Sequence, residues 1–197
     1  MQRTERQGHG FIFEEYVEKV YGINRSIDGY GKNYTDLWDG KAGSYPVSIK
    51  HIKKYNAVDL ADIFRQASIN EDFFMFVDFY ETNTVSESDE IHILFIPCKD
   101  WKQYFLPLEE FKPKFQNALN SVSNSPADDE KWTALRKECV DFWKNNTPGL
   151  ITPNGKRDHK SQKRWQCSIN KTNFFKEFIP KYEISEEGFF NATRNKK

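Results

Sequence analysis

Two short, strongly apolar runs constrain the fold of this chain more than any other feature of its sequence. They span residues 73–80 and 91–96, are rich in aromatic and aliphatic side chains, and are separated by the polar segment 82–90. Apolar runs of this length between turn-forming segments are typical of strands buried inside a sheet. We therefore expect an adjacent antiparallel pair of strands at the centre of the fold.

Helical spacing of apolar residues predicts one helix before and one helix after a hairpin. The first spans residues 10–21, and the second spans residues 59–67, with Asp59 favouring its N-terminus. The apolar face of the first helix consists of Phe13, Val17, Val20 and Tyr21.

Between these helices, residues 34–39 and 45–52 have the alternating pattern of two strands joined by a four-residue turn. Because side chains alternate along a strand, Ser48 and Lys50 point to the same face. The hairpin then brings Asp39, at the end of the first strand, opposite both of them.

The expected order of helix, strand, hairpin, helix, strand and strand predicts an α/β fold of the α+β kind, with helices packed on a central mixed sheet. The later part of the chain has helical patterns at 108–122 and 129–143, then a turn-rich segment at 148–156 and a basic run. We expect a core at residues 1–100 and a helical, basic extension at residues 101–197, packed together as one domain.

Asp39, Ser48 and Lys50 are the candidate catalytic group. Hydrolysis of a phosphodiester near neutral pH requires a bound metal ion, an activated water molecule and positive charge near the phosphate. Mg²⁺ is held by one or two carboxylates together with water, and a nearby lysine can orient or deprotonate the attacking water. These three residue types at one end of a sheet therefore predict a Mg²⁺-dependent nuclease.

Over residues 9–80 the chain resembles the PD-(D/E)XK nuclease superfamily. The GFIFE segment ending at Glu14 is similar to the acidic first helix of that superfamily, the DG pair beginning at Asp39 to its strand acid, and the SIK segment ending at Lys50 to its acid-x-Lys element. The resemblance implies a restriction-endonuclease-like core. It also implies that Asp39 and Glu14 bind Mg²⁺ and that Lys50 positions the attacking water.

Ser48 stands where this superfamily usually has an acid. Several restriction enzymes with a Ser-x-Lys element recover the missing carboxylate from elsewhere in the fold. Glu14 is the first candidate for that carboxylate, and Asp62 and Glu71 are the alternatives. In this hypothesis Ser48 contacts the metal ion through water.

A second candidate site is the basic run within residues 154–170, which we expect to contact DNA. In a chain of net charge +0, a local density of positive charge predicts contact with phosphates, and the alternative is a solvated loop. Lysine and arginine suit phosphates and guanine edges, and glutamine suits adenine. The candidate DNA-binding residues are Lys156, Arg157, His159, Lys160, Gln162, Lys163 and Arg164.

Hydropathy and cysteine spacing limit the kinds of protein that this chain can be. No apolar run has the length of a membrane span, and the N-terminal residues are too polar for a signal peptide. Cys98, Cys139 and Cys167 lack the spacing of a zinc ribbon and predict buried, reduced thiols. We expect a soluble cytoplasmic protein of a bacterium, phage or virus, without a membrane partner.

These features lead to three hypotheses. The first is a type II restriction endonuclease that cuts double-stranded DNA at a specific sequence with Mg²⁺ and acts as a homodimer. The second is a repair or junction nuclease with the same core. The third is a catalytically inactive DNA-binding module, because Ser48 leaves the site one carboxylate short.

Overall fold

The computed structural model describes residues 5–24, 37–81, 91–158 and 162–194. It is a mixed α/β protein, as predicted, but it has two sheets where one central mixed sheet was expected, and the chain divides into two compact units. The first unit consists of Met1–Asn56, Asn70–Cys98 and Lys171–Lys197. The second unit consists of Ala57–Ile69 and Lys99–Asn170.

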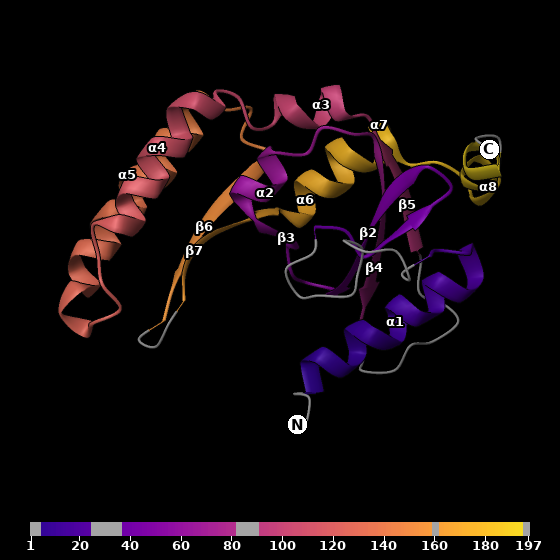
Figure 1. Cartoon of the computed structure of the whole chain (residues 1–197), viewed down its shortest axis with the longest axis horizontal. Helices are drawn as coiled ribbons and strands as arrows, with labels where there is room; N and C mark the ends of the chain where they lie inside the picture. Colours follow the sequence, from indigo (N-terminus) through magenta and orange to yellow (C-terminus); the bar gives the residue numbers. More distant parts are fainter. Residues whose placement is uncertain (1–4, 25–36, 82–90, 159–161, 195–197) are drawn as a thin grey trace. The chain divides into compact units, whose positions relative to one another are not determined.

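The first unit is built on a four-stranded mixed sheet in the order β1-β2-β4-β5 (Figure 1). β2 is antiparallel to β1 and parallel to β4, and β4 is antiparallel to β5. The elements are α1 (Glu5–Tyr21), β1 (Gly40–Ala42), β2 (Tyr45–Lys53), β4 (Phe73–Tyr80), β5 (Ile91–Ile96), α6 (Lys171–Asn173), the π-helix η2 (Phe174–Phe178), α7 (Ile179–Tyr182) and α8 (Glu186–Arg194).

One face of this sheet packs against α1 and α8 in a core rich in phenylalanine. The core residues are Phe13, Val17, Tyr21, Ile23, Ala42, Val47, Ile49, Phe74, Phe76, Ile93 and Phe189. Val20 was expected on the buried face of the first helix, but it is 45% exposed. The inward positions of α1 repeat every four residues, so Val20 falls outside this stripe.

The opposite face of the same sheet is contacted by the segment from α6 to α7. The ring centroid of Phe175 lies 5.3 Å from that of Phe79 and 5.4 Å from that of His92. Side chains alternate along β2, and Val47 and Ile49 belong to the α1 side. Ser48 and Lys50 therefore point to the face that α6–α7 contacts.

The second unit is a three-stranded antiparallel sheet in the order β3-β7-β6, with α4 and α5 side by side along the β6–β7 hairpin (Figure 1). Trp143 Nε1 donates a hydrogen bond to the carbonyl of Ile151 at 2.7 Å, so this buried ring keeps a partner for its polar atom. The elements are β3 (Val58–Asp62), α2 (Ile63–Ala67), α3 (Cys98–Gln103), α4 (Leu108–Asn120), the 3₁₀ helix η1 (Pro126–Asp128), α5 (Asp129–Asn146), β6 (Ile151–Arg157) and β7 (Lys163–Ile169).

The hairpin of the first unit differs in register from the expected one. Its turn lies at Gly43 and Ser44, and Gly43 has φ of 59°, which suits a two-residue turn. Asp39 consequently lies just before β1 rather than within a strand. Residues 34–36 of the expected strand lie outside the described residues.

Two further segments depart from the expected pattern. Residues 59–67 were expected to be one helix, but they begin as β3, and Asp62 rather than Asp59 caps α2 by accepting hydrogen bonds from two backbone N–H groups. The segment 148–156, expected to be a turn-rich linker, contains most of β6.

The boundary between the two units also differs from the expected one at residue 100. Residues 57–69 group with the second unit because β3 pairs with β7. Residues 171–197 group with the first unit because α6, α7 and α8 pack on its sheet.

Candidate active site

Asp39 is fixed at the open end of the β1–β2 hairpin by its neighbours in sequence. Trp38 is buried, and its ring centroid lies 5.0 Å from that of Phe73 on β4. The backbone N–H of Asp39 donates to the carbonyl of Val47 at 2.9 Å. The main chain of Asp39 is therefore held against β2, and its side chain starts from a defined position.

The Asp39 carboxylate turns back onto β2. Its Oδ2 accepts a hydrogen bond of 2.6 Å from the backbone N–H of Ile49 and a longer one of 3.4 Å from Ser48 Oγ. β1 pairs with β2 only as far as Gly40 opposite Val47, so the Ile49 N–H lies beyond the end of β1. The carboxylate completes the hydrogen bonding of this strand edge, which is a structural role in itself.

Lys50 completes the group from the same face of β2. Its Nζ lies 3.9 Å from Asp39 Oδ2, and the two side chains are 20% and 29% exposed. Ser48 is buried beside them. The structure thus brings together the acid, the hydroxyl and the lysine, and it leaves the acid and the lysine accessible to solvent. Their role in catalysis stays a prediction.

Glu14 lies on a helix that packs on the other face of the sheet. It follows Phe13 on α1 and is half-buried, and α1 packs on the sheet face opposite to Ser48 and Lys50. The role of Glu14 as a metal ligand stays a prediction.

The two alternative acids have other surroundings. Asp62 Oδ1 accepts hydrogen bonds of 3.0 Å from the N–H groups of Phe64 and Arg65, so it serves as the N-cap of α2 in the second unit. Glu71 is exposed just before β4. Neither position adds support for a carboxylate beside Asp39.

The oxygen atoms of Asp39 and Ser48 are the hard ligands that Mg²⁺ prefers, and a single carboxylate with water and phosphate oxygens is sufficient for a weak Mg²⁺ site. Within residues 5–24, 37–81, 91–158 and 162–194, however, no three His, Cys, Asp or Glu side chains form a metal-binding group. Asp39 and Ser48 therefore offer the ion one carboxylate and one hydroxyl oxygen, and the Mg²⁺ site stays a prediction.

The described candidate DNA-binding residues lie on or beside the β6–β7 hairpin, and Arg157 and Lys163 make contacts within the protein. The Arg157 side chain is only 2% exposed and donates to Asp129 Oδ1 at 2.7 Å and to the carbonyls of Ser123 and Ser125. Lys163 Nζ donates to the carbonyls of Leu119 and Val122, near the C-terminus of α4. Both side chains hold the hairpin to the loop between α4 and α5.

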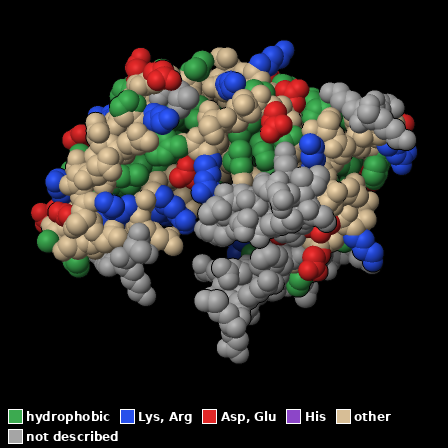
Figure 2. All heavy atoms as spheres, viewed as in Figure 1, with side chains coloured by type: hydrophobic (Ala, Val, Ile, Leu, Met, Phe, Trp, Pro, Cys, Tyr) green, Lys and Arg blue, Asp and Glu red, His purple; other side chains and the backbone are tan. Residues whose placement is uncertain are grey.

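The other basic-run residues divide into exposed and undescribed positions. Lys156 and Gln162 are exposed, Arg164 is half-buried, and His159 and Lys160 lie outside the described residues. Among the coloured atoms of Figure 2, basic and acidic side chains are interspersed rather than gathered into one basic patch. DNA contact by this run stays a prediction, which Lys156 and Gln162 support best.

One buried polar pair was not anticipated. His51 Nδ1 lies 2.7 Å from Asp78 Oδ2, with the two side chains 6% and 2% exposed, although the atoms do not meet in hydrogen-bonding geometry. The His51 ring is stacked between Phe13 and Tyr80 at centroid distances of 5.0 and 4.2 Å. The pair lies on the face of β2 away from Lys50. The signal in the sequence was an aspartate inside an otherwise uncharged strand.

Comparison of the chain with protein-family models, with curated proteins and with solved structures gives no match. No helix in the described part of the chain is long and apolar enough to cross a membrane. The chemistry proposed below therefore depends on the residues and their geometry.

Proposed function

We propose that this chain is a Mg²⁺-dependent endonuclease of restriction type that cuts double-stranded DNA. The observation that carries the proposal is the convergence of Asp39, Ser48 and Lys50 at one end of the β1–β2 hairpin, with Lys50 Nζ 3.9 Å from Asp39 Oδ2. A carboxylate and an ammonium group at this separation can act on one phosphate group.

The topology around these residues gives a second line of support. The chain runs from α1 through the hairpin and helix α2 to β4, which lies parallel to β2. This order is compatible with the PD-(D/E)XK-like core that the sequence resemblance implies. The intervening β3 belongs to the other sheet, and residues 25–36, where an earlier strand was expected, are not described.

Each side chain has a defined task in the proposed reaction. Mg²⁺, when bound, activates a water molecule and offsets charge on the phosphate. The Asp39 carboxylate would hold the ion, and the Ser48 hydroxyl would contact it through water. Lys50 orients the attacking water and stabilises negative charge that develops on the phosphate. Glu14 is the proposed second carboxylate. Two copies of the chain related by a two-fold axis match the symmetry of a two-fold symmetric DNA site, so we also propose a homodimer.

A specific observation favours a second candidate, a DNA-binding module without catalytic activity. The Asp39 carboxylate already accepts the Ile49 N–H, and Ser48 provides no charge. If no second carboxylate joins Asp39, the site holds metal weakly. A junction nuclease with the same core differs from the main proposal only in the DNA that it cuts.

The test is to incubate the protein with supercoiled plasmid and Mg²⁺ and to sequence the ends that form. We expect one fixed sequence at every end, and a loss of at least about 100-fold in rate for Lys50→Ala, with binding retained in EDTA. Lys53→Ala is the matched control, because Lys53 is an exposed lysine on the same strand. Full cleavage by Lys50→Ala would overturn the assignment.

The products also separate the alternatives. Ends that form only beside branches favour the junction nuclease. Salt-sensitive binding without cleavage in Mg²⁺ or Mn²⁺ favours the inactive module.

A further inference from the structure

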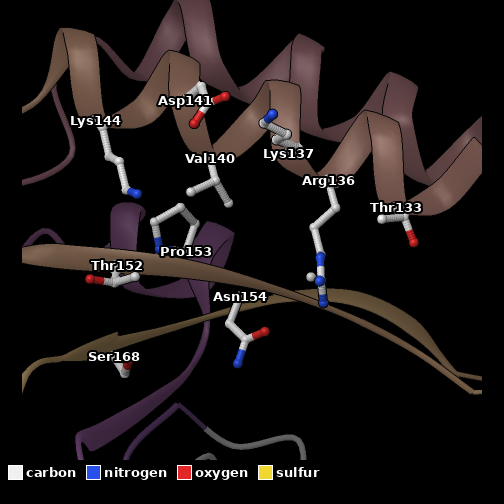
Figure 3. A pocket seen from close by; sticks show the side chains of 11 residues that line it. Thr133, Arg136, Lys137, Val140, Asp141, Lys144, Thr152, Pro153, Asn154 and Ser168 are labelled. Carbon is white, nitrogen blue, oxygen red and sulfur yellow. The ribbon is translucent and has the colours of Figure 1, made fainter.

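A hollow of about 650 Å³ lies between α5 and the β6–β7 hairpin, entirely within the second unit. We name it the α5–β6 hollow. Figure 3 shows Arg136 and Lys144 reaching from α5 towards β6, on either side of Val140. Thr152 and Asn154 of β6 and Ser168 of β7 line the opposite wall.

The charge of this hollow is strongly one-sided. Arg136, Lys137 and Lys144 line it, all three are exposed, and none of them forms an ion pair within the described residues. The acidic side chain among its lining residues is Asp141, which lies on α5 between Lys137 and Lys144. In a chain of net charge +0, such a local excess of unpaired cations favours an anionic ligand.

The spacing of the two inward-reaching cations suits a repeating anion. Arg136 and Lys144 are eight residues apart on α5, which corresponds to about 12 Å along the helix axis. A DNA strand carries one phosphate at each nucleotide, so phosphates recur within a span of this length. The two side chains can therefore meet separate phosphates of the same strand.

The strand wall adds neutral hydrogen-bonding groups of the kind that contact phosphates. Thr152 and Asn154 are exposed because they alternate with the buried Ile151, Pro153 and Gly155 along β6. β6 is an edge strand, but Pro153 in its middle removes one backbone donor. This proline disfavours addition of a peptide strand to the edge, which relies on an unbroken row of backbone hydrogen bonds.

We infer that the α5–β6 hollow binds the sugar–phosphate backbone of DNA. The inference rests on the proposed function for the choice of DNA as the partner. It adds to that function a contact surface built on α5, whose cations belong neither to the Asp39 group nor to the basic run. Arg136 and Lys144 of α5 provide the charge for this contact.

The test measures binding of a short fluorescein-labelled duplex by anisotropy over a range of salt concentrations in EDTA. Arg136→Ala/Lys144→Ala should bind more weakly and reduce the slope of log K against log[salt] by about 1.8, since each lost phosphate contact removes about 0.9. The matched control is Lys102→Ala/Lys112→Ala, which removes the same charge from exposed positions on α3 and α4. Its slope should remain within error of that of the unmodified protein.

Two single substitutions make the test directional. Asp141→Asn removes the acidic side chain of the hollow and should tighten binding, and Asn154→Glu should weaken it. An unchanged slope for the Arg136/Lys144 variant, an equal effect of the control pair, or weaker binding by Asp141→Asn would overturn the inference. A labelled polyglutamate peptide provides a further check. If its binding depends on Arg136 and Lys144 and the binding of the duplex does not, the inference is also overturned.

The experiment is independent of cleavage, because EDTA removes Mg²⁺. If the hollow binds DNA but the plasmid stays intact, the inference stands and the nuclease proposal fails. If the plasmid is cut but the Arg136/Lys144 variant binds the duplex normally, the nuclease proposal stands and the inference about the hollow fails.

Discussion

The Asp39 carboxylate accepts a hydrogen bond of 2.6 Å from the backbone N–H of Ile49, and this bond gives the residue a structural role alongside its proposed chemical one. The two roles can be separated because an asparagine keeps an oxygen acceptor but loses the charge. The same relationship thus provides the first prediction.

Asp39→Asn should retain the stability of the protein, whereas Asp39→Ala should lower the free energy of unfolding by about 1 kcal/mol, because it leaves the Ile49 N–H without its acceptor. Both variants should lose Mg²⁺-dependent cleavage. Urea denaturation and plasmid cleavage measure the two effects. Full cleavage by Asp39→Asn would remove the carboxylate from the proposed chemistry.

The buried His51–Asp78 pair should matter greatly for stability. Asp78→Leu should lower the free energy of unfolding by about 1–3 kcal/mol, because it leaves the buried imidazole Nδ1 without its polar neighbour. The double variant His51→Leu/Asp78→Leu should recover most of this loss, since two apolar side chains suit the core between Phe13 and Tyr80. A double-mutant cycle measures the coupling, and simply additive losses would contradict the prediction.

Two neighbouring basic residues should give opposite results. Arg157→Ala should lower the free energy of unfolding by about 2 kcal/mol, because its buried guanidinium holds Asp129 and two loop carbonyls. Lys156→Ala should leave stability unchanged and reduce the salt slope of DNA binding by about 0.9. Thermal unfolding and anisotropy measure the pair. If Arg157→Ala stays stable but binds DNA more weakly, Arg157 contacts DNA and its proposed structural role is wrong.

Tyr21 should make the protein sensitive to high pH. Burial, together with the hydrogen bond of 2.5 Å to Glu186 Oε1, raises the pKa of the Tyr21 hydroxyl above its ordinary value near 10. Because the folded-state pKa is raised, the stabilisation is fully present below about pH 10 and is lost as pH rises towards the folded pKa. Tyr21→Phe should unfold with less pH dependence above about pH 10, and an unchanged profile would contradict this prediction.

The three thiols should differ in reactivity. Burial raises the pKa of Cys139 to about 11, so little reactive thiolate exists at pH 8, and Cys167 is fully buried. We expect Ellman's reagent to modify only Cys98 rapidly in the native protein, because this side chain is half-buried. All three should react in urea, and Cys98→Ser should abolish the rapid phase. A second fast thiol in the native state would contradict this expectation.

The sequence predicted the helices and strands whose apolar patterns lie within a single segment of the chain. The strands β4 and β5 are buried on both faces, so they read as continuous apolar runs, and α4 and α5 show helical periodicity. β6 was missed because Pro153 and Gly155 resemble turn residues. Gly155 is needed for a different reason, since a Cβ there would lie 2.6 Å from Cζ2 of Trp132. β3 was hidden by a bulge near Ala61, which has φ of 65°.

The candidate site was predictable where it depends on local sequence patterns. Alternation along one strand placed Ser48 and Lys50 on one face, and the hairpin brought Asp39 to them even though the turn lies later than expected. The roles of Arg157 and Lys163 could not be foreseen, because their partners lie between 28 and 44 residues away in sequence. Which side of the sheet α1 covers is likewise a tertiary property.

The division of the chain into interleaved units has a consequence for how the protein is made. The chain crosses between the units four times, after Asn56, Ile69, Cys98 and Asn170, so no single cut of the gene yields either unit whole. During synthesis, the segment from α6 to α7 that packs beside Phe79 and His92 leaves the ribosome only after the entire second unit. Until residues 171–182 have been synthesised, the sheet face with Ser48 and Lys50 lacks this cover, so the first unit cannot complete its packing.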